Sequence, residues 1–354
     1  MFRGTGAGIN CGAWARRFPS SHHLKTTPRA YTRLNPTTTY YSTKRSHQVN
    51  THNPTRDMST SRKVVQKVFA AEVDEGVGSK VRRSIGSPQL RNLTPFLMLD
   101  HFHTPTGAGF PDHPHRGQVT VTYMLEGASL HEDSAGHKGK IKAGGVQWMC
   151  AGRGIIHAEM PQYAPNLPEP RGMQLWVDLP KEYKMVEPSY QELDPEEIPV
   201  AYPQGEDGPV KIKVISGKSY GTESPVRPLG GCWYFHVIFS RPGTVFQDLP
   251  AGWTAFIYML KGAVRVGSDP TPHAAFHTLV LSAASDETGV ELTATEENTE
   301  LVLVAGEPLD QPVVQYGPFV MTSREEIQKT LIDYQYGRNG FEKAHTWKSE
   351  IGHM

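Results

Sequence analysis

The chain has 354 residues, with 36 basic and 36 acidic side chains, and this length suits two domains plus extensions. Its extended apolar runs are only of strand length, which excludes a membrane-spanning helix. Three scattered cysteines, Cys11, Cys150 and Cys232, argue against a disulfide framework and favour a reducing compartment.

The net charge of zero is unevenly distributed, because the N-terminal segment, called the head below, is strongly basic. Residues 1–56 contain nine Lys and Arg residues and no Asp or Glu, so subtracting these nine from 36 leaves 27 basic against 36 acidic residues, a net charge of −9 for the rest. An acidic body binds a phosphate backbone poorly, and no direct nucleic-acid binding is expected.

The head (1–60) is also rich in Ser, Thr and Tyr, a composition typical of a mitochondrial transit peptide. The alternative interpretation is a disordered basic tail. We expect a mitochondrial location when this segment is used. A product that starts at Met58 is expected to be cytoplasmic or nuclear.

The body alternates short β-like runs with turns, and its 34 glycines and 28 prolines suit many short strands. This pattern is typical of an antiparallel all-β sandwich or barrel. One set of runs precedes a polar, Pro-rich stretch at about 188–208, and a second set follows it. The first set is 64–65, 68–69, 97–99, 119–125, 146–149 and 173–177, and the second is 210–215, 233–239, 255–260, 279–281 and 301–305.

Two short motifs carry the candidate metal ligands. His113 and His115 are two residues apart, and so are His157 and Glu159. Side chains in a strand alternate between faces, so the members of each pair point the same way. Three neutral imidazoles and one carboxylate can enclose a divalent transition ion and leave open positions if the geometry is octahedral. These residue types alone allow Mn, Fe, Ni, Co, Cu or Zn.

A string repeats across the two sets of strands. YMLEGA at 123–128 recurs as YMLKGA at 258–263, an offset of 135 residues. This period indicates duplication of a whole β domain, although a common strand-turn string is the alternative. The offset places Asp248 opposite His113 and Pro250 opposite His115, so the second copy is expected to bind no metal.

A helix is predicted near the C-terminus. Ser323 and Glu326 form a capping box, and Ile327, Leu331 and Tyr334 make an apolar stripe at helical spacing. The helix is expected to end near Gly337 and to pack on a sheet.

Four segments closely resemble the motifs of the pirin family, in the cupin superfamily. They are 111–117 (PDHPHRG), 123–127 (YMLEG), 147–149 (QWM) and 151–160 (AGRGIIHAEM). The resemblance runs from about Val64 to the C-terminus. It implies two tandem cupin barrels, at 61–190 and 191–320, followed by a helix and tail at 321–354.

The resemblance also implies one iron, as Fe(II), in the first barrel, held by His113, His115, His157 and Glu159. Many cupins take a glutamate four or five residues after the second histidine, but Val119 and Thr120 stand there in this chain. The carboxylate is therefore expected from Glu159.

Other histidines offer alternative ligands. His101 and His103 form another H-x-H pair, interpreted as pocket-edge or surface residues because they do not match the family motif. The cluster 131–133 is predicted to lie on the solvent face of a turn, and His273 and His277 are predicted to be surface residues.

Three residues near the motifs have predicted supporting positions. Arg116 and Trp148 are expected at the mouth of the site or next to its ligands, where imidazoles need hydrogen-bond partners. Cys150 is expected to be a small buried residue.

Two classes of function follow from the resemblance. The first is a quercetin 2,3-dioxygenase, in which a flavonol chelates the metal, loses its hydroxyl proton to Glu159 and is cleaved by O2 with release of carbon monoxide. The second is an iron-dependent transcriptional co-regulator, a metal- or redox-sensing module that binds a protein partner. A monomer without membrane contact is expected in either case.

Overall fold

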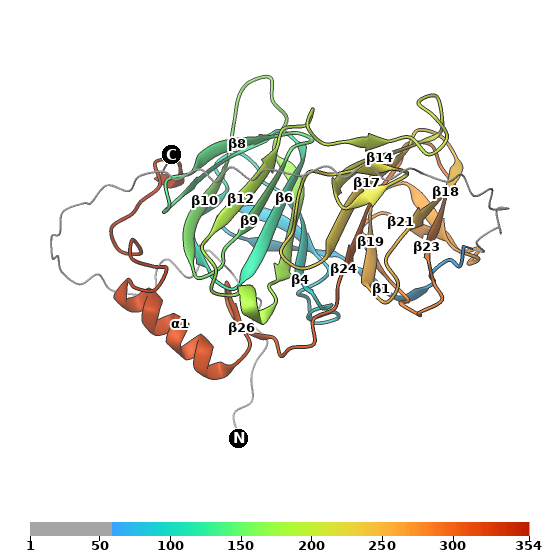
Figure 1. Ribbon diagram of the computed structural model, residues 1–354. Coiled ribbons are helices and arrows are strands. Elements are labelled where there is room, and N and C mark those ends of the chain that lie inside the picture. The colour runs from blue at the N-terminus through green and yellow to red at the C-terminus, as the bar shows by residue number, and fades with distance from the viewer. Residues whose placement is uncertain (1–58, 354) are drawn as a thin grey trace, which may run out of the picture.

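The computed structural model describes residues 59–353. The predictions for the transit peptide, Met58 and Cys11 fall outside this range. Two β barrels lie side by side, and the helix packs at the far end of the first barrel (Figure 1). No helix among the described residues is long and apolar enough to cross a membrane. The strands and sheets confirm the predicted all-β fold with two barrels.

The first barrel combines a seven-stranded sheet in the order β12-β9-β6-β11-β4-β3-β2 with a four-stranded sheet in the order β5-β10-β7-β8. Its strands are β2 (Ala71–Glu75), β3 (Ser79–Arg83), β4 (Phe96–His103), β5 (Phe110–His115), β6 (Gln118–Glu126), β7 (Ala128–Asp133), β8 (Lys138–Lys142), β9 (Val146–Cys150), β10 (Ile155–Pro161), β11 (Arg171–Asp178) and β12 (Ser189–Leu193).

The second barrel repeats this plan, with sheets in the orders β1-β22-β19-β24-β17-β14-β13 and β18-β23-β20-β21. Its strands are β1 (Val64–Phe69), β13 (Val200–Ala201), β14 (Val210–Ser216), β17 (Cys232–Phe239), β18 (Gly243–Asp248), β19 (Thr254–Lys261), β20 (Ala263–Val266), β21 (His273–Ala274), β22 (His277–Leu281), β23 (Gly289–Ala294) and β24 (Thr299–Gly306). Short connections add η2 (Lys181–Tyr183), β15 (Lys218–Ser219) and β16 (Thr222–Glu223).

The repeated string occupies the same place in both barrels. Its first copy runs from β6 into β7 and its second from β19 into β20. Gly127 and Gly262 join these strands with φ of 69° and 70°, a left-handed conformation that favours glycine. The structural match supports duplication of a whole domain.

The first strand crosses between the barrels. The sequence-based boundary at residue 61 assigns β1 to the first barrel, but β1 pairs with β22 of the second. Only Ala70 separates β1 from β2, which starts the first barrel's sheet. The first barrel also extends past residue 190, because β12 pairs with β9.

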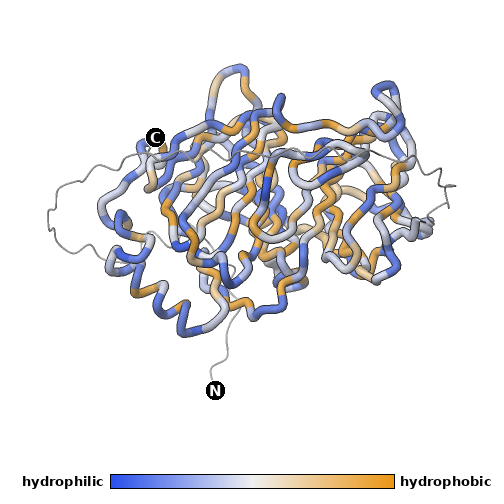
Figure 2. The backbone as a smooth tube through the Cα atoms, viewed as in Figure 1, coloured by the Kyte–Doolittle hydropathy of each residue, from blue (hydrophilic) through white to orange (hydrophobic). Residues whose placement is uncertain are grey.

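The two seven-stranded sheets share one apolar core. Tyr123 and Leu175 from the first sheet pack in the same cluster as Phe256, Tyr258 and Val304 from the second. A separate apolar cluster, including Phe235, Ile257 and Leu303, fills the second barrel. In Figure 2 the strands are mostly pale or orange, and the loops at the rims are mostly blue.

The C-terminal elements are β25 (Val314–Tyr316), β26 (Phe319–Met321), α1 (Arg324–Tyr336) and η3 (Ile351–His353). The predicted capping box of Ser323 and Glu326 is present, and Gly337 ends the helix in a left-handed conformation. The apolar stripe packs against Phe319 and Ile156. The predicted packing of this helix on strands is confirmed.

Candidate metal centre and cavity

Two neighbouring strands bring the predicted clamps together. β5 and β10 pair antiparallel, with His113 opposite His157 and His115 opposite Ile155. The register of this pairing shifts between His157 and Glu159 because β5 contains the extra residue, whereas β10 pairs regularly with β7 over the same residues. All four side chains are buried, which places them inside the barrel rather than on its surface.

The three imidazoles converge on one point. Their ligand nitrogens all lie within 4.8 Å of one another, and no other such group of three occurs in residues 59–353. The Nε2 atoms of His113 and His157 are 3.0 Å apart. Two nitrogens bound at about 2.1 Å, at a right angle, are roughly 3.0 Å apart. The triad therefore fits a single shared ion.

Hydrogen bonds orient the ligand rings. His113 Nδ1 donates to the Pro111 carbonyl at 2.8 Å, which leaves Nε2 free to bind a metal. Nδ1 of His115 lies 2.9 Å from the Gln118 amide, and the His115 ring meets Trp176 edge-on. Burial, and then the neighbouring imidazoles, hold the pKa values of His115 and His157 well below the usual range. Both rings are therefore neutral at neutral pH, as metal ligands must be.

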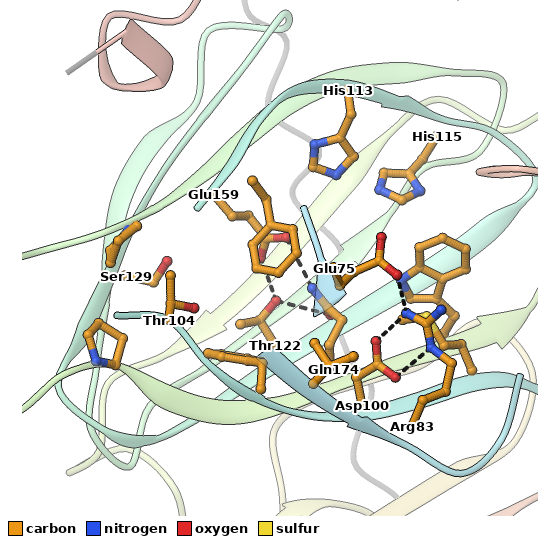
Figure 3. A pocket seen from close by; sticks show the side chains of 17 residues that line it. Glu75, Arg83, Asp100, Thr104, His113, His115, Thr122, Ser129, Glu159 and Gln174 are labelled. Carbon is orange, nitrogen blue, oxygen red and sulfur yellow. Dashed lines mark hydrogen bonds and ion pairs between the residues drawn. The ribbon is translucent and has the colours of Figure 1, made fainter. Parts of the chain in front are cut away.

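The carboxylate of Glu159 lies in the same cavity but outside the histidine group. The Thr122 hydroxyl donates to Oε1 at 2.7 Å, and the Gln174 amide donates to Oε2 at 3.0 Å. The structure thus brings together three of the four predicted ligands. Figure 3 shows Glu159 beside Thr122 and Gln174 and below His113 in this view.

Two of the three imidazoles, those of His113 and His115, line a cavity of about 660 Å³, part of which is open to solvent. This volume is in the usual range for small-molecule sites. Its wall combines His113, His115 and Glu159 with further polar side chains and an apolar lining. The polar side chains include Glu75, Arg83, Asp100, Thr122 and Gln174, and the apolar ones include Met98, Phe102, Phe110 and Trp176.

Several of these wall residues were not predicted from the sequence. Thr122 and Gln174 lie on β6 and β11, and Arg83 and Asp100 lie on β3 and β4. These strands are adjacent in the sheet but up to about 90 positions apart in the chain. The only signal in the sequence was the alternation of side chains along each strand, which indicates which residues face the interior of the barrel.

Arg116 is not at the mouth of the site. Its guanidinium is fully buried beneath α1, where it donates to Asp333 Oδ2 at 3.0 Å and to Thr330 Oγ1 at 3.1 Å. The predicted position of Trp148 is also wrong, because Trp148 packs in the core between the barrels. Cys150 is buried as predicted.

The prediction for 131–133 is wrong. His131, Glu132 and Asp133 are all buried on β7, because β7 pairs with both β10 and β8. His131 and Asp133 stand opposite Glu159 and His157. The acidic and histidine-rich composition suggested a solvated turn, but the pairing places this strand within the sheet.

The remaining histidines do not join the metal centre. His101 packs between the barrels, with Nδ1 3.3 Å from the Tyr258 hydroxyl, and burial lowers its pKa to about 4. His103 contacts Glu169 at 2.7 Å near the surface, as predicted. His277 is half-buried, whereas His273 is buried, so its predicted surface position is wrong. Asp248, at the end of β18, is exposed, and the absence of metal from the second barrel stays a prediction.

This architecture defines a two-barrel cupin with a histidine-lined cavity in its first barrel. The family model described as Pirin matches residues 78–177, and the Pirin C-terminal cupin domain matches residues 234–340. The chain is 48% identical to Pirin from Homo sapiens over 302 residues, which cover 83% of this chain and 100% of that protein. The chain belongs to the pirin family.

Further relatives extend this likeness. Pirin-like protein 2 from Arabidopsis thaliana is 46% identical over 294 residues, covering 82% of this chain and 89% of that protein. Among solved structures, a quercetin 2,3-dioxygenase from Acinetobacter baumannii superposes with a TM-score of 0.72 at 30% identity. That match covers 80% of this chain and 99% of the other.

Proposed function

We propose that this protein is a metal-dependent dioxygenase that cleaves flavonols, with Fe(II) held by His113, His115, His157 and Glu159. The observation that carries the proposal is the convergence of three buried imidazoles, two of which line a cavity large enough for a small aromatic molecule. The likeness to the Acinetobacter baumannii quercetin 2,3-dioxygenase supports the same reaction class.

The residues of the cavity have different roles in the proposed reaction. Iron bound there supplies the Lewis acidity and the redox chemistry that couple a flavonol to O2. Glu159 takes the proton of the flavonol hydroxyl beside the carbonyl group, because a carboxylate within reach of that hydroxyl is a suitable general base. Thr122 and Gln174 hold this carboxylate by one hydrogen bond to each oxygen. The apolar wall restricts water around the reacting ring.

The exchange Glu159→Gln tests the proposed base. Gln keeps the size of the side chain and one carbonyl oxygen, but it removes the anionic base. We expect it to retain appreciable iron and to lose flavonol cleavage by on the order of 10²-fold or more. The assay follows quercetin loss and carbon monoxide release under O2, with iron content measured on the same sample.

The outcomes separate the role of Glu159 from the reaction itself. An iron-replete Glu159→Gln protein with undiminished turnover per iron would rule out Glu159 as the base. A parent protein that holds iron and cleaves no flavonol would contradict the dioxygenase proposal. That result would favour the second function, a metal-sensing module, for which the net charge of −9 outside the head suits a basic protein partner.

A further inference from the structure

A second polar cluster shares the cavity with the candidate metal ligands. Arg83 donates from Nε and Nη2 to the two oxygens of Asp100 at 2.8 and 2.6 Å, and from Nη2 to Glu75 at 2.8 Å. We call these three residues the Arg83 cluster. Glu75 and Asp100 are only 5% and 3% exposed, yet all three side chains line the cavity. In Figure 3 they gather at one side of it, below His115 in this view.

The Arg83 cluster keeps hydrogen-bonding capacity for a ligand. Nη1 of Arg83 takes part in none of these three bonds, and each oxygen of Asp100 has more than one lone pair. Burial lowers the pKa of Arg83, but the charges of Asp100 and Glu75 outweigh burial and raise it. The guanidinium of Arg83 therefore stays charged between the two carboxyl groups.

The chemistry around the cluster limits what it can bind. The neighbouring wall is apolar and aromatic, with Met98, Phe102, Phe110 and Trp176. A ligand carboxylate or phosphate at this end would face two carboxylates in a poorly solvated space, which costs free energy. A neutral hydroxyl can donate to a carboxylate and also accept from the Arg83 guanidinium, so it satisfies both kinds of group.

We propose that Glu75, Arg83 and Asp100 recognise a hydroxyl group at the far end of a neutral aromatic substrate whose near end binds the metal. This inference rests on the proposed flavonol-cleaving function and names its specificity-determining residues. For a flavonol, the recognised group is a hydroxyl of the pendant phenyl ring. The competing explanation is that the cluster only fastens β3 to β4, since Arg83 and Asp100 are direct cross-strand partners.

The test uses three flavonols with no, one or two hydroxyls on the pendant ring, which are galangin, kaempferol and quercetin. Dissociation constants are measured without O2 on the metal-loaded protein by calorimetry. The parent should bind the hydroxylated flavonols about tenfold or more tightly than galangin, the scale of one hydrogen bond to a charged group. Under O2, KM should follow the same order while kcat changes little.

Two variants and a matched control identify the residues responsible. Asp100→Asn and Glu75→Gln keep side-chain size and remove one charge each, and both should reduce the preference over galangin by about tenfold. Glu72→Gln breaks the exposed ion pair with Arg82 on the same β2–β3 hairpin and should leave the preference unchanged. If Asp100→Asn fails to fold, Glu75→Gln decides, because Asp100 still makes two bonds to Arg83.

The outcomes distinguish this inference from the proposed function. Equal affinity of the parent for all three flavonols would overturn recognition by the Arg83 cluster while leaving flavonol cleavage intact. A full preference retained by a folded Asp100→Asn or Glu75→Gln protein would also overturn it. No binding and no cleavage of any flavonol by the metal-loaded parent would overturn the proposed function itself.

Discussion

Removing Asp333 is expected to destabilise the protein strongly, because it leaves a buried cation without its anion. Arg116 and Asp333 are 1% and 0% exposed and are joined by a 3.0 Å ion pair. Without the carboxylate, Arg116 keeps hydrogen bonds to Thr330 and to the Arg153 carbonyl and a ring contact with Phe341. None of these neutral groups balances its charge. Breaking a buried pair in this way costs about 3–5 kcal/mol.

The assay is equilibrium urea unfolding of Asp333→Ala and Asp333→Asn beside the parent. The alanine variant should lose about 3–5 kcal/mol. The asparagine variant should lose less, because its amide oxygen can still accept from Arg116. The matched control is Glu72→Ala, which breaks an exposed ion pair to Arg82 and should cost below about 1 kcal/mol.

The pH dependence of this loss has a definite sign. Burial alone would raise the pKa of Asp333, but hydrogen bonds from Asn339, Arg116 and Arg338 outweigh it and lower the pKa. A carboxyl whose pKa is lower in the folded state stabilises the protein above its unfolded pKa, about 3.9. The gap between the parent and Asp333→Ala should therefore be constant from about pH 8 to 5 and should close in acid. A loss below about 1 kcal/mol, or a gap that closes between pH 8 and 6, would refute this reasoning.

Two further predictions concern the metal and the head. The parent should bind about one metal per chain by the four-ligand count, and His113→Ala or His157→Ala should abolish loading measured by elemental analysis. His101→Ala should load like the parent, and equal loss there would contradict the choice of ligands. Residues 1–57 fused to a fluorescent reporter should enter mitochondria, whereas a fusion starting at Met58 should not. A diffuse signal from the longer fusion would remove the targeting hypothesis.

Much of the fold could be predicted because strand patterns are local. The apolar runs at 119–125 and 255–260 fall within β6 and β19, and the repeated string marks equivalent turns in both barrels. The pairing of β1 with β22 could not be read in this way. A strand's period indicates which face is buried, but it does not identify the neighbouring strand.

The candidate site was predictable only where its residues are adjacent in sequence. His113 and His115 share one strand, and their spacing indicates a common face. Gln174 and Thr122 approach Glu159 from β11 and β6, and a single polar residue in a strand carries no such signal. Arg116 directly follows the candidate ligand His115 in sequence, yet its partner Asp333 lies 217 positions away, so only the tertiary structure reveals its role.

The second barrel supports the site in the first even though it lacks the first pair of histidines. Thr122 faces the cavity, while its neighbours Val121 and Tyr123 pack in the core shared by the barrels. Because side chains alternate along β6, burial of Val121 and Tyr123 against the second barrel turns Thr122 toward the cavity. Thr122 is there in position to hold Glu159. The Tyr123 hydroxyl extends this contact to His236 of β17 at 2.9 Å.

Strand β11 repeats the arrangement, with Gln174 in the cavity between Met173 and Leu175 in the shared core. The interior of the second barrel is filled by apolar side chains such as Phe235, Ile257 and Leu303, which makes it a closely packed support. Duplication of the domain thus provides one barrel that contains a cavity and another whose packed interior supports the core between them. Thr122 and Gln174, which hold Glu159, lie on the first barrel's seven-stranded sheet, whose other face packs in the shared core. Loosening the core between the barrels should therefore disturb the carboxylate before it disturbs the histidine triad, which lies on β5 and β10.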